Sequence, residues 1–167
     1  MADKEATVYI VDVGEAMADC HNGRDESDLD WAMRYVWDKI STTVAANRKT
    51  WTVGVIGLGT NRTKNPQAEE GLEGYDHISV LQEIQAMSMS SLRDLKSRIK
   101  PSRTSGGDAF SAIVVAMSMI ETYTKKLKYN RRIILVTNGE VPIEDPEDSI
   151  EDVAGRLSEL GIELVVM

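Results

Sequence analysis

Short apolar runs rich in β-branched residues alternate along the chain with segments whose apolar residues recur at helical spacing. The runs span residues Thr7–Val11, Trp51–Leu58, Arg132–Val136 and Ile162–Val166. They lack the polar–apolar alternation of a half-exposed strand, so they predict strands covered on both faces, as in parallel sheets. A shorter run, Ile78–Val80, predicts an edge strand.

The segments between these runs predict four helices. Each carries an apolar stripe at helical spacing, and they span Asp28–Ala46, Ser91–Ile99, Asp108–Leu127 and Pro146–Leu160. For the last of these, Asp145 is a candidate N-cap, Pro146 fits the first helical position and Gly161 fits the carboxyl end. The polar segment Asn61–Asp76, which contains Asn, Pro, Gly and Glu, predicts a long loop.

Alternation of strands and helices predicts an α/β fold, a Rossmann-like, mostly parallel sheet with helices on both faces. The 167 residues suit one domain, residues 1–167. The chain ends on an apolar strand with no polar cap after Met167. We therefore expect a fragment of a longer polypeptide, truncated at the carboxyl end of its domain.

The composition of the chain argues against several classes of function. The chain has 19 Lys and Arg against 27 Asp and Glu, a formal charge of −8, which argues against a free-standing nucleic-acid binder. No apolar stretch approaches the roughly 18 residues of a membrane span, and no secretory signal opens the chain. One cysteine excludes an internal disulfide, and two histidines disfavour a histidine-rich metal site.

Three loops are expected to meet at the carboxyl edge of the sheet, where open α/β sheets bind ligands. They are residues 12–17, 103–108 and 137–140. Their order resembles the von Willebrand factor A family, whose adhesion site holds a metal ion with Asp-x-Ser-x-Ser, a later Thr and the Asp of a Thr-Asp-Gly turn. Two positions match that pattern and three depart from it: Asp12 and Thr104 match, whereas Gly14, Ala16 and Asn138 do not.

This degenerate site predicts no useful metal binding. Mg²⁺ requires near-octahedral oxygen coordination, usually with one or two carboxylates. Gly14 and Ala16 carry no side-chain oxygen, and Asn138 carries no charge. We therefore expect no metal and no other cofactor. Asp12 is then interpreted as a carboxylate that accepts backbone N–H bonds in its loop. The alternative is a metal-dependent ligand-binding domain of the same fold from an unrelated protein.

Four longer blocks carry a closer resemblance. They read YIVDVGEAM, GLGTNRTKNP…GYDHISV, KSRIKPSRTSGGDAFSAIVVAMSMI and RRIILVTNGE. In this order they are similar to the larger (80-kDa) subunits of Ku, the DNA-end-binding heterodimer, in their fungal form. The resemblance covers essentially the whole chain and implies an amino-terminal von Willebrand A-like domain. The DNA-binding β-barrel and later regions of such subunits are absent from these residues.

The resemblance also implies a biological role. Ku subunits of this kind act in the nucleus, including telomeric chromatin, in non-homologous end joining of double-strand breaks and in telomere maintenance. The larger subunit pairs with the smaller one, mainly through the absent regions, and the parent ring binds DNA ends. The amino-terminal domain docks short peptide motifs of repair or telomeric proteins. No membrane role is implied.

Enzyme activity is not expected of this segment. Family members often carry an ATP-dependent helicase label, yet no G-x-x-x-x-G-K-[ST] loop occurs in the chain. SGGDAF and GLGTNRTKN lack the Lys-Ser/Thr ending of such a loop. We therefore expect no catalytic residue here. A third alternative is an ATP-using enzyme whose site is completed by segments absent from this chain.

The resemblance places a peptide groove between the long loop and the long helix. By position it falls on Gln67, Tyr75 and Val114, with Ile113 and Met117 close by. Gln67 stands where an apolar residue is expected. Core packing is the competing interpretation of Val114 and Met117, whereas an aromatic hydroxyl beside a polar loop suits Tyr75 to an interface.

Two basic clusters complete the candidate features. The first contains Arg93, Lys96, Arg98, Lys100 and Arg103, and the second contains Lys125, Lys126, Lys128, Arg131 and Arg132. Each lies near a predicted helix end, where cations meet the negative end of the helix dipole. We interpret them as solvated helix ends, with phosphate contacts to DNA as the functional alternative.

Overall fold

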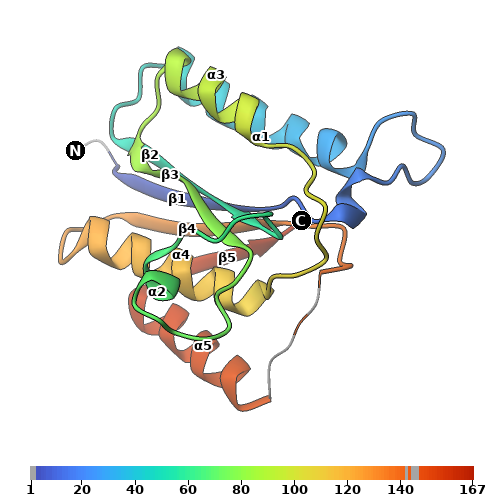
Figure 1. The fold of residues 1–167 in the computed structure, drawn as a ribbon. Helices are drawn as coiled ribbons and strands as arrows, with labels where there is room; N and C mark the ends of the chain where they lie inside the picture. Colours follow the sequence, from blue (N-terminus) through green and yellow to red (C-terminus); the bar gives the residue numbers. More distant parts are fainter. Residues whose placement is uncertain (1–2, 142, 144–146) are drawn as a thin grey trace.

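A five-stranded sheet with the order β3-β2-β1-β4-β5 organises the computed structural model, which describes residues 3–141, 143 and 147–167 (Figure 1). Its strands are β1 (Glu5–Asp12), β2 (Trp51–Leu58), β3 (Ile78–Ala86), β4 (Asn130–Val136) and β5 (Ile162–Val166). Strands β1, β2, β4 and β5 pair in parallel, while β3 runs antiparallel to β2 at the edge. The predicted mostly parallel α/β sheet is confirmed.

Helices cover both faces of the sheet (Figure 1). They are α1 (Asp28–Ala45), α2 (Pro66–Glu69), α3 (Met89–Arg98), α4 (Ala109–Thr124) and α5 (Glu147–Leu160), with a 3₁₀ turn η1 (Glu15–Ala18) after β1. Among the described residues, no helix combines the length and apolar character needed to cross a membrane.

Alternate residues of β1 divide the core into two layers. Val8 and Ile10 face a cluster with Ile120 of α4. Tyr9 and Val11 face the opposite cluster, which contains apolar residues of α1 and α3. Because successive strand side chains point to opposite faces, a continuous apolar run is what a sheet buried on both sides requires.

Local signals explain where the helices begin and end. Helix α3 begins at Met89, earlier than predicted, because Ser88 and Ser91 form a reciprocal capping box. Helix α4 ends at Thr124 because Lys125 takes a φ of 48°, outside helical geometry. The predicted loop 61–76 contains the short helix α2, whose N-cap Asn65 accepts a hydrogen bond from the Ala68 amide. Asp145 and Pro146, predicted to open the last helix, lie outside the described residues.

Candidate functional site

The five adhesion-site positions come together at the carboxyl edge of the parallel strands. Asp12 ends β1, and the turn that contains Gly14 and Ala16 follows it. The Glu15 amide donates to the Thr104 carbonyl at 3.0 Å, which holds the loop between α3 and α4 against this turn. Asn138 follows β4 and donates from Nδ2 to the Ala16 carbonyl at 3.3 Å. The expected meeting of the three loops is confirmed.

Both carboxylate oxygens of Asp12 are occupied by hydrogen bonds within the loops. Oδ1 accepts from the Gly14 amide at 2.9 Å, and Oδ2 accepts from the Thr137 hydroxyl at 2.7 Å. The side chain is only 3% exposed. Burial raises the pKa of Asp12 above its ordinary 3.8, and these two hydrogen bonds oppose the rise.

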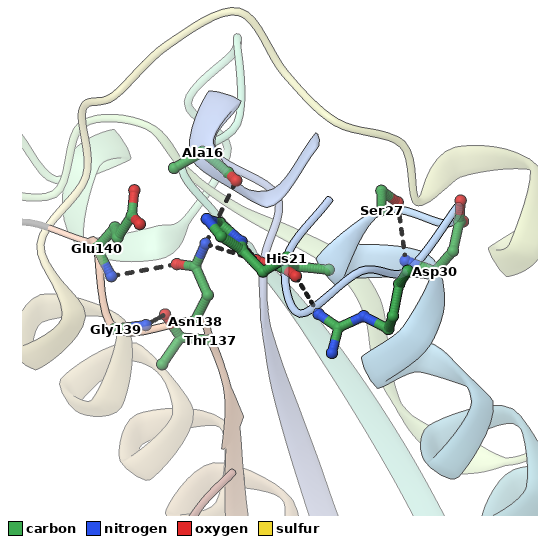
Figure 2. Close-up of polar contacts among 10 residues, drawn as sticks. Ala16, His21, Ser27, Asp30, Thr137, Asn138, Gly139 and Glu140 are labelled. Atoms are coloured by element: carbon green, nitrogen blue, oxygen red, sulfur yellow. Dashed lines mark hydrogen bonds and ion pairs between the residues drawn. The ribbon is translucent and has the colours of Figure 1, made fainter. Parts of the chain in front are cut away.

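Asn138 is directed away from Asp12, toward α1. Its Nδ2 donates to Ala16 and also to Asp28 Oδ2 at 3.2 Å, while its Oδ1 accepts from the Glu140 amide at 3.1 Å (Figure 2). Thr104 uses its hydroxyl to accept from the Gly106 amide at 3.0 Å. The donor set left around Asp12 therefore does not fit the six oxygen ligands that Mg²⁺ requires. Among the described residues, no group of three His, Cys, Asp or Glu side chains forms a metal-binding cluster.

A polar cluster around Asp28 lies next to the adhesion-site positions. Asp28 Oδ2 contacts His21 Nδ1 at 2.6 Å, and Oδ1 accepts a hydrogen bond from Arg24. Burial favours a higher pKa for Asp28, but hydrogen bonds from His21, Asn138 and Arg24 outweigh it and hold the pKa below 3.8. The hydrogen bond between His21 and Asp28 also raises the pKa of His21 above 6.5. The cluster ties the turn after β1 to the loop after β4.

This cluster forms one wall of a cavity of about 680 Å³ at the carboxyl edge of the sheet. Residues of the turn, of α1, of the loop after β4 and of the segment after β5 line it, among them Met17, Trp31, Tyr35, Glu140 and Met167. The Arg24 guanidinium stacks 4.7 Å from the centre of the Trp31 ring, which is 52% exposed.

The sequence signal for the Asp28 cluster is weak. His21 and Asp28 are seven residues apart, but His21 precedes the predicted helix Asp28–Ala46, so helical spacing does not bring the two together. The contact from Asn138 arises only because β1 and β4 are neighbours in the sheet. The sequence alone did not predict this group, because the pairing of strands that are distant in the sequence brings its residues together.

The predicted peptide-docking residues lie on the opposite side of the sheet, along α4 and the loop before β3. Tyr75 and Val114 are half-buried against the core, whereas Ile113 and Met117 are 4% and 5% exposed and lie within it. Oε1 of Gln67 is buried and has no hydrogen-bond partner among the residues that the structure describes. Three of the five residues, Gln67, Tyr75 and Val114, are therefore partly accessible, and the other two form the layer beneath them.

A second cavity, of about 470 Å³, adjoins this surface. Pro66, the neighbour of Gln67, lines it together with Ile84 of β3 and with Ser118, Met119 and Thr122 of α4. The loop that carries α2 therefore packs over α4 and leaves a depression beside it. Figure 1 shows α2 and its loop lying over α4.

Comparison with known proteins decides the family. The profile of the family described as "Ku70/Ku80 N-terminal alpha/beta domain" matches residues 6–166. The chain belongs to this Ku family. The Ku resemblance drawn from the sequence is thereby confirmed.

Fungal relatives agree with this assignment. The Ku domain is 72% identical over its full length to "ATP-dependent DNA helicase II subunit 2" of Chaetomium globosum and 65% identical to the protein of that name from Neurospora crassa. A Schizosaccharomyces pombe relative is 43% identical over 82% of the chain. The chain spans only 22%, 23% and 19% of these proteins. Although these relatives are named as helicase subunits, the matched segment is a structural domain, and nothing in its described residues shows catalysis.

A solved structure agrees with the fold. The crystal structure titled "Crystal Structure of the SpRpn10 VWA domain" superimposes with a TM-score of 0.69 at 15% identity. The match covers 98% of the Ku domain and 74% of that chain. At this identity the likeness concerns the fold alone, and it confirms the predicted von Willebrand A-like fold.

Proposed function

We propose that this chain is the amino-terminal interaction domain of a larger Ku subunit. In this proposal the parent protein pairs with the smaller Ku subunit and binds DNA double-strand ends in non-homologous end joining and telomere maintenance. It acts in the nucleus, including telomeric chromatin. The full-length match to fungal relatives supports the assignment. The net charge of −8 supports a role in which DNA contacts lie mainly outside this domain.

The proposed role of the domain itself is to dock short peptides on Gln67, Tyr75, Ile113, Val114 and Met117. The observation that carries this proposal is the position of Tyr75, half-buried on the loop that packs over α4. Asn65 is 1% exposed and fixes the loop, because its Nδ2 donates to the Tyr75 carbonyl at 2.9 Å and to the Ile78 carbonyl at 2.8 Å. An aromatic side chain with a polar tip, carried on a fixed loop, is a typical interface anchor.

Peptides selected on the chain from a random 12-residue phage library test the docking surface. We expect Tyr75→Ala to weaken the best selected peptides by more than about 1 kcal/mol, roughly fivefold in affinity. Tyr35→Ala is the control, because Tyr35 is an exposed tyrosine on α1, on the opposite face of the sheet. Peptides that bind Tyr75→Ala as tightly as the unaltered chain would remove Tyr75 from the site.

Retention on DNA tests the parent role separately. The full-length product that carries this chain is expected to be retained, with a second large subunit, on linear DNA but not on closed circular DNA of the same sequence. Equal retention on both DNA forms, or none, would contradict the DNA-end role. The outcome is independent of Tyr75, so the two parts of the proposal can fail separately.

A further inference from the structure

A third cavity, of about 460 Å³, lies between the loop after β2, the start of β3 and the segment after α3. All of its charged lining residues are cations: Arg62, Lys64, Arg98 and Lys100. The remaining lining residues are uncharged, including Asn61, Ser79 and Ser102. Such a cavity is unexpected on a domain with a net charge of −8.

Backbone and side-chain hydrogen bonds fix the walls of this basic cavity. Ser102 is 9% exposed, and its amide donates to the Val13 carbonyl at 2.7 Å. The Arg103 amide donates to Asn61 Oδ1 at 3.0 Å, so the segment after α3 is attached to the loop after β2. On the other wall, the Val80 amide donates to the Lys64 carbonyl at 2.7 Å. The cavity is therefore preformed by the fold.

The cations of the basic cavity are poorly neutralised. Arg98 donates to the Leu81 carbonyl and pairs with the exposed Asp94 at 2.8 Å. Within the described part of the chain, Arg62, Lys64 and Lys100 have no carboxylate partner. By contrast, Arg131 of the second cluster is used structurally, because it donates to the Leu160 carbonyl at the end of α5 at 2.7 Å. The helix-end interpretation thus suits the second cluster better than the first.

The side-chain hydroxyl groups in the cavity are already engaged as donors. Ser102 Oγ donates to the Gly59 carbonyl at 2.5 Å, and Ser79 Oγ donates to the Arg62 carbonyl at 2.7 Å. We therefore expect the cations, rather than the hydroxyl groups, to recognise a ligand here. Clustered Arg and Lys side chains are suited to a compact group with two negative charges and several acceptor oxygens.

We propose that this basic cavity binds the phosphoryl group of a phosphorylated serine or threonine in a partner protein. A phosphoserine side chain is small enough to enter a 460 Å³ concavity, whereas a DNA duplex is too wide to do so. The acidic domain also repels an extended polyanion, while cations gathered in a concavity attract a single phosphoryl group locally. The proposal goes beyond the docking surface around Tyr75, because the two surfaces share no residue.

Titration of the ¹⁵N-labelled chain with the peptide acetyl-Gly-Gly-pSer-Gly-Gly-amide tests the proposal. We expect saturable shifts of backbone amide signals at Lys64, Lys100 and their neighbours, and none with the unphosphorylated peptide. The double variant Lys64→Glu, Lys100→Glu is expected to weaken binding at least tenfold. The control Lys126→Glu, Lys128→Glu makes the same charge change on exposed residues after α4 and is expected to bind as the unaltered chain does.

Three results would overturn the proposal. One is the absence of saturable shifts with the phosphopeptide in the folded chain, as judged from its dispersed spectrum. Another is an equal loss of binding in the control variant, which would mean that only overall charge matters. The third is displacement of the peptide by a 12-base-pair duplex at lower concentration than by free phosphoserine, which would assign the cavity to nucleic acid. Circular dichroism of both double variants verifies that they fold.

Discussion

The Thr137 hydroxyl donates a 2.7 Å hydrogen bond to Asp12 Oδ2, although 125 residues separate the two in sequence. Thr137 follows β4 and Asp12 ends β1, and these two strands are parallel neighbours in the sheet. The Gly139 amide donates in turn to the Thr137 hydroxyl at 3.0 Å. The result is a continuous hydrogen-bond chain at the position where the adhesion site of this fold would hold its metal.

This relationship predicts that Thr137→Val destabilises the domain. The substitution preserves the shape of the side chain but leaves a buried carboxylate oxygen without its donor, which typically costs about 1–3 kcal/mol. Urea unfolding at pH 7 measures the effect. Thr137→Ser retains the hydroxyl and is expected to lose less than half as much. A loss in Thr137→Ser as large as that in Thr137→Val would contradict this expectation, because it would mean that the methyl group contributes as much as the hydrogen bond.

The same geometry predicts that Mg²⁺ and Mn²⁺ have no strong site. Both oxygens of Asp12 are engaged, and Gly14 and Ala16 contribute no side-chain oxygen. Calorimetric titration with either ion is expected to show no saturable heat below an ion concentration of about 1 millimolar, because most of the oxygen ligands are missing. A sub-millimolar site that Asp12→Ala abolishes would contradict this prediction and restore the metal-dependent alternative.

The His21–Asp28 pair predicts a pH-dependent contribution to stability. The pKa of His21 is raised above 6.5 by its hydrogen bond to Asp28, so its contribution is fully present below pH 6.5 and disappears as pH rises through the folded value. The pKa of Asp28 is lowered below 3.8 because hydrogen bonds outweigh burial. Its contribution is fully present above pH 3.8 and disappears as pH falls through the folded value.

We therefore expect the unfolding free energies of the unaltered chain and His21→Gln to differ most between pH 3.8 and 6.5. Urea unfolding at pH 5.5 and pH 9 measures the difference, which should shrink at the higher pH. Gln retains hydrogen-bonding capacity but has no titrating ring, so the comparison isolates the charge of the imidazole. A difference that is equal at both pH values would show that His21 acts only through packing or neutral hydrogen bonding.

Sequence patterns predicted the layers better than the contacts between them. The β-branched runs located β1, β2, β4 and β5, because strands buried on both faces need continuous apolar sequence. The edge strand β3 was predicted only over Ile78–Val80, since its second half carries Gln82, Glu83 and Gln85. Pairing with β2 extends it to Ala86, which is a tertiary effect that local propensity does not encode.

The positions of the loops at the candidate sites could be predicted from the sequence, whereas the directions of their side chains could not. The order of the three loops identified the adhesion-site edge because parallel strands end at one side of the sheet. The direction of Asn138 toward Asp28, and the cations gathered beside Lys64, depend on how the loops pack. A sequence supplies such residues but not the side to which each one points.

The last prediction concerns Gln67, whose Oε1 atom is buried and has no hydrogen-bond partner within the described part of the chain. Leucine has a similar volume and carries no polar atom, so Gln67→Leu is expected to raise the free energy of unfolding by about 1 kcal/mol, because a buried acceptor without a donor is costly. The measurement is urea unfolding. Gln85→Leu on the exposed part of β3 is the control and is expected to give no gain. Gln67→Leu also places an apolar side chain in the proposed docking surface, so peptides that dock through apolar contacts should bind it more tightly. A variant less stable than the unaltered chain would show that Oε1 has a bound water partner.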